Sequence, residues 1–91
     1  MAKKKYPLPH FPVMLFGMPR LGNIIRQTRK AHGIKQEELA RQTGTSRGFI
    51  SAVENGKRTA EMQKVFLLLR FLDIGVQLVD LKQMHEQEEK T

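Results

Sequence analysis

The chain has 91 residues and no cysteine, which fits one small domain and excludes disulfides and thiolate metal sites. Its net charge of +7 is uneven: residues 1–58 carry 12 Lys and Arg against 3 Asp and Glu, whereas residues 59–91 carry 4 against 6. The first part therefore has the charge expected of a surface that meets a polyanion such as nucleic acid, although a merely soluble basic protein would show the same excess.

Residues 1–17 form a basic N-terminal extension that contains prolines at 7, 9 and 12. These prolines interrupt it and no small-residue cleavage site follows, so we expect a tail rather than a signal peptide. Apolar runs elsewhere, such as VFLLL at 65–69, are far shorter than the ~20 residues of a membrane helix, so we expect a cytoplasmic protein without a membrane partner. Within the extension, FPVMLF (11–16) is predicted to be an edge strand, a docking peptide or a cover for the core of its own chain.

A first helix is predicted to begin near Pro19, a residue favoured in the first helical turn, and to close at Gly33. Residues that repeat at i, i+3, i+4 and i+7 predict its buried face: Leu21, Ile24, Ile25 and Thr28. The other faces are predicted to hold the basic residues Arg20, Arg26, Arg29 and Lys30.

Two short helices are predicted next, over about 36–43 and 46–54, the second with Thr45 as its N-cap. Their contact requires a small residue on the first helix, a turn residue that tolerates positive φ and an aliphatic anchor on the second helix. Ala40, Gly44 and Ile50 meet these three requirements. The pattern indicates a helix-turn-helix whose second helix is free to enter a DNA major groove.

A fourth helix is predicted over about 60–72 with Thr59 as its cap, and it is apolar nearly all round. One face is predicted to hold Met62, Val65, Phe66, Leu69 and Leu72, and the opposite side Leu67, Leu68 and Phe71. Such a helix must be buried on two sides, and a second copy of the chain is the simplest second surface.

The segment VQLVDL (76–81) is predicted to be a strand, because four of its six residues are aliphatic and two of these are β-branched. A lone strand leaves its backbone groups unpaired, so we expect it to pair with the same strand of a second copy or with FPVMLF. The predicted dimer interface consists of Leu67, Phe71, Val76 and Leu78. Residues 82–91 are predicted to be a polar, frayed tail.

The stretch IRQTRKAHGIKQEELARQTGTSRGFISAVENGKR resembles the XRE, or lambda-repressor-like, helix-turn-helix family. Its flanks, GMPRLGNIIRQTRK and GKRTAEMQKVFLLLRFLDIGVQLVD, resemble HipB-type antitoxins, so the resemblance covers residues 18–81. It implies an all-α, lambda-repressor-like bundle of four to five helices with one C-terminal β-strand that pairs across a homodimer. The chain departs from the family at Lys35, where a Thr or Ser cap is usual.

We accordingly expect a helix-turn-helix DNA-binding domain over 18–75 and a dimerisation strand over 76–81. The resemblance places the base-reading positions in the first two turns of the third helix, at Ser46, Arg47, Gly48 and Ser51. The guanidinium group of Arg47 could donate two hydrogen bonds to guanine O6 and N7, or it could contact a phosphate instead. Gly48 would let the backbone approach a base closely, or it is simply tolerated at an exposed position.

Phosphate contacts are expected from residues at the start of the second helix and just after the third, namely Gln36, Asn55, Lys57 and Arg58. The two cations could also simply be solvated or complement the negative end of the third helix. The run of lysines at 3–5 could form an arm along the duplex or a solubilising tail.

We expect no enzyme, because His10, His32 and His85 are scattered and no nucleophile motif or glycine-rich phosphate loop is present. No metal, cofactor or small-molecule substrate is expected either. The resemblance implies a repressor that binds double-stranded operator DNA, regulates its own operon and acts as antitoxin to a Hip-type serine/threonine kinase toxin. The alternatives are a stand-alone XRE-family repressor without a toxin partner and an interaction protein that no longer reads DNA.

Overall fold

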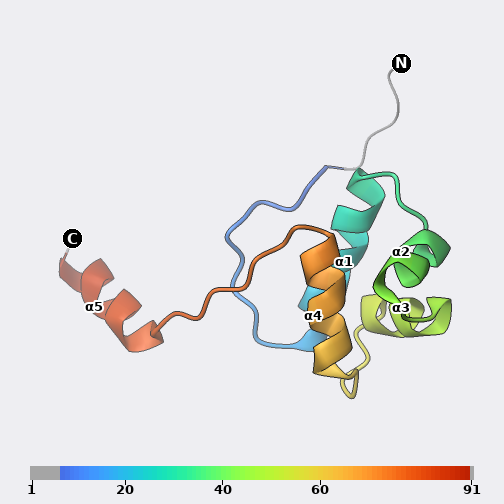
Figure 1. The fold of residues 1–91 in the computed structure, drawn as a ribbon. Helices are drawn as coiled ribbons and strands as arrows, with labels where there is room; N and C mark the ends of the chain where they lie inside the picture. The colour runs from blue at the N-terminus through green and yellow to red at the C-terminus, as the bar shows by residue number, and fades with distance from the viewer. Residues whose placement is uncertain (1–6, 91) are drawn as a thin grey trace.

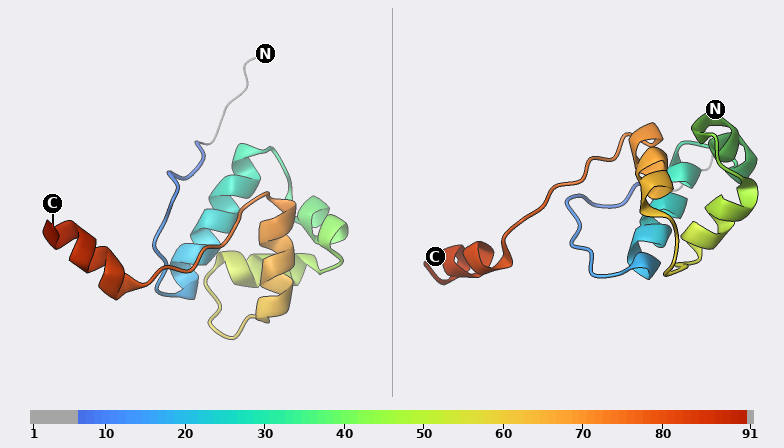
Figure 2. Two further views of the ribbon diagram at one scale, coloured as in Figure 1. Left: turned by 60° about the vertical axis from the view of Figure 1, so that its left-hand side comes forward. Right: turned by 60° about the horizontal axis from the view of Figure 1, so that its bottom comes forward.

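The computed structural model describes residues 7–90, with side chains as far as Glu86, and its regular structure is entirely helical (Figure 1). The helices are α1 (Met18–Ala31), α2 (Gln36–Thr43), α3 (Arg47–Glu54), α4 (Met62–Phe71) and α5 (Leu81–Lys90). The first four pack into one body, whereas α5 stands apart from it at the end of an extended linker (Figures 1 and 2). The all-α class is therefore confirmed. No helix within the described range is long and apolar enough to cross a membrane.

The core lies where α1, α2, α3 and α4 meet, and most of its side chains were predicted to be buried. It consists of Leu21, Ile25, Leu39, Ala40, Ile50, Val53, Val65, Leu68, Leu69 and Leu72. The buried face predicted for α1 is confirmed in full, because Ile24 and Thr28 are buried as well. Pro19 stands in the first turn of α1, and Gly33 follows its end with a positive φ, as predicted.

The α2–α3 turn depends on Gly44, which has φ 71° in the left-handed region where a side chain would be strained. Two backbone hydrogen bonds close this turn, from Gly44 N to Arg41 O at 3.4 Å and from Thr45 N to Ala40 O at 2.9 Å. The predicted anchor, Ile50, is fully buried. The helix-turn-helix geometry is therefore present as predicted.

The caps predicted for two helices are wrong. The N-cap of α3 is Ser46, whose Oγ accepts a hydrogen bond from Phe49 N at 3.0 Å, and α3 begins one residue later than predicted, at Arg47. Thr45 instead contacts the Thr43 hydroxyl at 3.0 Å. Helix α4 begins at Met62 after Glu61, which makes no side-chain cap hydrogen bond, so Thr59 does not cap it. For α3 the start is set by a local cap, because two hydroxyl residues stand side by side before the helix and Ser46 is the one whose oxygen reaches a backbone N–H of the first turn.

The division predicted for the faces of α4 is also partly wrong. Its core face is formed by Val65, Leu68, Leu69 and, just past its end, Leu72. Its exposed face carries Met62, Phe66, Leu67 and Phe71. An apolar helix does not reveal from its own sequence which stripe meets the core, because both stripes have the same chemistry.

Helix α1 crosses the end of α3 unusually closely at Gly22. A Cβ at this position would lie 2.1 Å from Val53 O, so any side chain would force the two helices apart. Gly22 was not singled out in the sequence, because a glycine inside a helical pattern carries no periodic signal of its own.

The termini differ from the prediction. The segment 76–80 has no regular structure, and 11–16 forms no strand, since neither segment meets a partner strand within residues 7–90. The C-terminal segment, predicted to be frayed, instead forms α5. Asp80 caps this helix by accepting from Lys82 N at 2.9 Å and Gln83 N at 3.3 Å. The N-terminal segment runs along the body, where Gln27 Nε2 donates to Pro7 O at 3.0 Å.

Candidate nucleic-acid interface

The predicted base-reading residues lie together at the start of α3. Ser46, Arg47 and Gly48 are exposed, and Ser51 is half-buried one turn further along. The opposite face of α3 holds Ile50 and Val53 in the core. The helix therefore presents one polar, exposed edge while its other edge is held by the body, which is the arrangement needed to lie in a major groove.

No residue in the described part of the chain requires a glycine at position 48. A Cβ there would meet only Ser46 Oγ, at 3.9 Å, and would otherwise point into open space. Glycine costs roughly 0.5–1 kcal/mol relative to alanine within a helix. Gly48 thus lowers helix stability without relieving a contact in the fold.

Ser46 has a structural task in addition to the one predicted. Its Oγ accepts the hydrogen bond that caps α3, and this bond leaves the hydroxyl proton unused. The capping bond occupies one of the two acceptor lone pairs of the hydroxyl, so Ser46 can still donate one hydrogen bond and accept one more.

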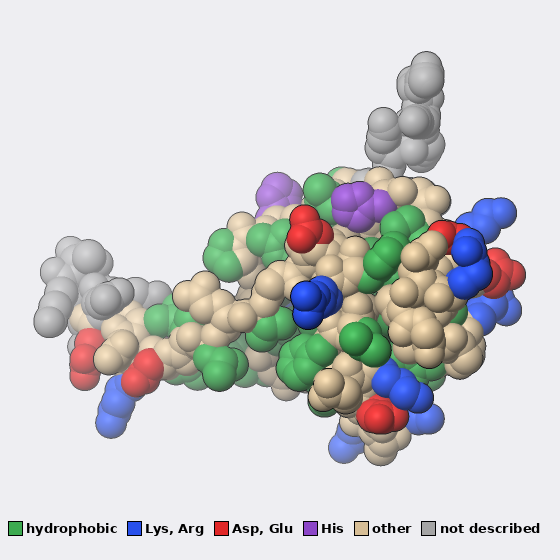
Figure 3. Space-filling view, viewed as in Figure 1, with side chains coloured by type: hydrophobic (Ala, Val, Ile, Leu, Met, Phe, Trp, Pro, Cys, Tyr) green, Lys and Arg blue, Asp and Glu red, His purple; other side chains and the backbone are tan. Residues whose placement is uncertain are grey.

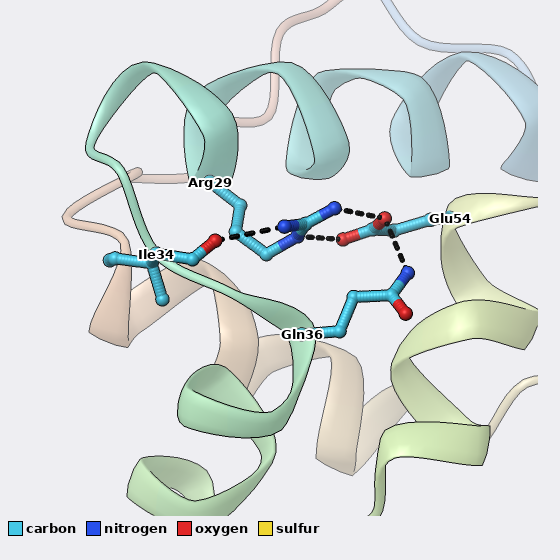
Figure 4. Close-up of polar contacts among 4 residues, drawn as sticks. All are labelled: Arg29, Ile34, Gln36 and Glu54. Atoms are coloured by element: carbon cyan, nitrogen blue, oxygen red, sulfur yellow. Dashed lines mark hydrogen bonds and ion pairs between the residues drawn. The ribbon is translucent and has the colours of Figure 1, made fainter.

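A buried ion pair that was not predicted joins α1 to α3, and a hydrogen bond from α2 meets it (Figure 4). Arg29 of α1 binds Glu54 of α3 through two hydrogen bonds, Nε to Oε2 at 2.6 Å and Nη2 to Oε1 at 2.9 Å. Arg29 Nη1 also donates to Ile34 O at 2.8 Å. Gln36 Nε2 of α2 donates to Glu54 Oε1 at 3.0 Å. The prediction that Arg29 lies on an outer face is therefore wrong.

A signal for this pair was present in the sequence. Arg29 follows Ile25 by four residues, so it lies along the edge of the buried stripe. Apart from the pair at 37 and 38, Glu54 is the only acidic residue among the first 58. Burial of both side chains is possible only because every charge is paired and hydrogen-bonded.

The predicted phosphate-binding residues flank α3 on two sides. Gln36 is half-buried at the start of α2, and one of the two N–H groups of its side-chain amide donates to Glu54. Asn55 is the C-cap of α3, and Lys57 and Arg58 are exposed just beyond it. As expected from its departure from the family, Lys35 makes no side-chain cap for α2. Basic side chains appear along the α2 edge and near the α3–α4 loop (Figure 3).

One further cation reaches the same region from α4. Lys64 Nζ lies 5.8 Å from the centroid of the Phe49 ring, which belongs to the first turn of α3. The ammonium also pairs with Glu61 at 3.5 Å. No pattern in the sequence pointed to Lys64, because its proximity to α3 depends on how the two helices cross.

The residues predicted to form a dimer interface are exposed in the single chain. Leu67 and Phe71 lie on the outer face of α4, and Val76 and Leu78 lie on the linker to α5. Leu78 is 92% exposed. The three histidines at 10, 32 and 85 are exposed, and no group of side chains within the described range could hold a metal ion.

A short exposed helix seated across a second one by a glycine turn, with cations at both of its ends, defines a helix-turn-helix DNA-binding protein. A family model of the helix-turn-helix matches residues 25–79, and the chain belongs to this family as a HipB-type member of its XRE branch. It is a DNA-binding regulator, and the family is not one of enzymes.

The relatives agree with this assignment. The uncharacterised HTH-type transcriptional regulator y4mF of Sinorhizobium fredii is 34% identical over 59 residues, which cover 65% of this chain and 78% of the relative. The ImmF control region 10 kDa protein of Bacillus phage phi105 is 35% identical over 60 residues, covering 63% of this chain and 66% of the phage protein.

Solved structures of HipB are similar to the whole body of the chain. A HipB complex with an O4 20mer has a TM-score of 0.70 and 26% identity, with 75% of this chain and 96% of that chain covered. A complex of HipA, HipB and O2-O3 gives the same TM-score, identity and coverage.

Proposed function

We propose that the chain is a sequence-specific repressor that binds its operator as a homodimer through α3. The base edges would be read by Ser46, Arg47, Gly48 and Ser51. The DNA backbone would be held by Gln36, Asn55, Lys57 and Arg58. The observation that carries the proposal is the exposed polar edge of α3, which ends in Arg47 on one side and leads to two exposed cations on the other.

The dimer is proposed to form through the outer face of α4 and the segment 76–80, which would become a strand by pairing with the same segment of the partner. The exposed apolar residues Leu67, Phe71, Val76 and Leu78 support this, since such surfaces mark interaction sites. A two-fold dimer would bind a palindromic operator with half-sites about one helical turn apart, ~34 Å.

Fluorescence anisotropy with a labelled duplex from the promoter of the gene tests the operator. We expect tighter binding to this duplex than to a shuffled one of the same length. Arg47→Ala should lower discrimination at one base pair by about 1–3 kcal/mol. Lys57→Ala should weaken binding to both duplexes alike and reduce the salt slope by about 1. Equal affinity of the unaltered chain for both duplexes would contradict the proposal.

We further propose that the regulator is the antitoxin of a Hip-type toxin–antitoxin system, that it represses its own operon and that it binds a serine/threonine kinase toxin. The likeness to HipB, one of whose structures includes HipA, supports this. Co-expression with the product of the neighbouring reading frame, followed by affinity purification, is the test. Recovery of a stoichiometric complex with a kinase-like protein is the expected result.

A stand-alone regulator without a toxin is the second candidate, and a specific observation favours it. The relatives that match by sequence at 34–35% identity include an HTH-type transcriptional regulator and the ImmF control region 10 kDa protein of a phage. If the purified chain binds its operator but forms no complex with any neighbouring gene product, this candidate replaces the antitoxin.

A further inference from the structure

We propose that α5 of each copy packs across the dimer on the N-terminal segment 7–17 of its partner, so that the two copies exchange their C-terminal arms. The inference rests on the proposed dimer and extends it to two segments that lie outside residues 25–79, the range that the family model matches. It assigns an occupant to the exposed apolar surface of the N-terminal segment.

No helix among the described residues 7–90 covers α5 in its own chain. It stands away from the other four helices in every view (Figures 1 and 2). Leu81 and Met84 lie three residues apart on one side of it, and Leu81 is exposed. A helix of ten residues is only marginally stable in water unless an apolar face is buried, so α5 requires a partner surface.

The N-terminal segment offers such a surface. Pro9 and Val13 are half-buried where the segment runs along α1, whereas Phe11, Leu15 and Phe16 are exposed. Phe16 is 80% exposed, an unusual state for a phenylalanine in a monomer. The segment lies on the side of the body away from α2 and α3, so it stays accessible when α3 binds DNA (Figure 2).

The two segments also carry opposite charge. Residues 1–20 contain 4 Lys and Arg and no Asp or Glu, whereas residues 80–91 contain 4 Asp and Glu against 2 Lys. Among the basic residues of the first set, Arg20 lines the groove between the N-terminal segment and α1. Among the acidic residues of the second set, Glu86 is exposed on α5. Opposite charge around an apolar contact favours association and fixes its orientation.

Symmetry directs α5 toward the partner rather than back to its own chain. In an antiparallel pair of strands related by a two-fold axis, the end of each strand lies beside the start of the other. A strand over 76–80 advances the chain by about 17 Å at ~3.4 Å per residue. Helix α5, which begins at Leu81, therefore emerges on the side of the partner's body.

The absence of cysteine from the chain makes a direct test possible. A Leu15→Cys chain with a large tag is mixed and refolded with an untagged Met84→Cys chain and treated with a short bismaleimide. We expect a covalent heterodimer on a denaturing gel. The matched control pairs Met84→Cys with Gln42→Cys, an exposed position on α2, and should give none. A dimer that yields no Leu15–Met84 product overturns the exchange.

Removal of residues 81–91 gives an independent readout, because α5 stands apart from the body. Sedimentation equilibrium should show the dimer of this shortened chain dissociating at a concentration at least about tenfold higher than the full chain. If the full chain stays monomeric even with promoter DNA, the proposed dimer itself fails. If both chains dimerise equally tightly, only the exchange of arms is overturned.

Discussion

Arg29 and Glu54 show how a single pair of side chains fixes the position of α3 on the body. The pair joins α1 to α3, while Gln36 and the carbonyl of Ile34 tie the start of α2 to the same cluster. Both charged side chains are more than nine-tenths buried. Because α3 is only eight residues long, this buried network and the α3 core contacts together hold the helix at a fixed angle to the body.

We predict that Arg29→Met lowers the free energy of unfolding by about 3–5 kcal/mol, since it leaves a buried carboxylate without its charge partner. The double variant Arg29→Met, Glu54→Leu should recover most of this loss, because it removes both charges and fills similar volume. Urea unfolding followed by circular dichroism measures both. A double variant as unstable as the single one would show that the network does more than neutralise charge.

Thr28 leads to a second prediction at this scale. Its Oγ1 is buried and makes no hydrogen bond to any residue in the described range. Thr28→Val should therefore raise the free energy of unfolding by about 1 kcal/mol, because it replaces an unpaired hydroxyl with a methyl group of the same shape.

Thr43→Val is the matched control, since the Thr43 hydroxyl donates to Leu39 O at 2.8 Å. This variant should lose about 0.5–1.5 kcal/mol. Both variants replace a hydroxyl with a methyl group, so opposite shifts of the urea midpoint would measure the contribution of the hydrogen bond to stability. Equal losses in both variants would mean that the Thr28 hydroxyl is satisfied in solution.

At the scale of elements, α3 is less stable as a helix than it could be, because its exposed first turn contains Gly48. The fold leaves room for a side chain at position 48, yet the residue is glycine. Helix α4 shows the complementary feature, a second apolar stripe that the body does not bury. In both helices the residues on the face turned away from the core are not those that would best stabilise a single chain. Such departures are typical of functional surfaces.

Gly48→Ala should separate stability from binding. We expect the free energy of unfolding to rise by about 0.5–1 kcal/mol, because alanine is the better helix former. Operator affinity should fall by at least about tenfold, because the methyl group lies where a base edge would approach. Urea unfolding and anisotropy measure the two effects. Unchanged operator affinity would indicate that the glycine is merely tolerated.

At the scale of the whole molecule, the helix-turn-helix and the apolar segments at the two ends of the chain occupy opposite sides. The helix-turn-helix of α2 and α3 lies on one side of the body, and the N-terminal segment and the linker to α5 lie on the other (Figure 2). A second copy can therefore join the apolar side while α3 remains free. This separation is the geometric requirement for a dimer that places two recognition helices on one duplex.

Leu78→Asp tests the dimer without disturbing the fold of one chain. Because Leu78 is 92% exposed, the unfolding free energy of the monomer should change by no more than about 0.5 kcal/mol. Sedimentation velocity should show a monomer at micromolar concentration where the unaltered chain is a dimer. Gln42→Asp on α2 is the control and should remain dimeric. If Leu78→Asp also remains dimeric, the proposed contact through 76–80 is wrong.

Much of the body follows from local signals in the sequence. The helix over 36–43, the buried stripe of α1 and the turn at Gly44 were predictable, because side-chain periodicity and the φ preference of glycine act within a few residues. The exposed position of Arg47 follows in the same way, since Ile50 and Val53 fix the opposite side of α3.

The rest depends on contacts between distant segments. Arg29 and Glu54 are 25 residues apart, and only the crossing of α1 and α3 brings them together. Which stripe of α4 is buried was likewise decided by packing, because the two stripes have the same chemistry. The sequence by itself therefore determined the four helices of the body and the polar residues on the exposed side of α3, but not α5. The tertiary structure alone decided which charges are buried and which apolar surfaces stay exposed, because a side chain is buried by residues that lie far from it in the sequence.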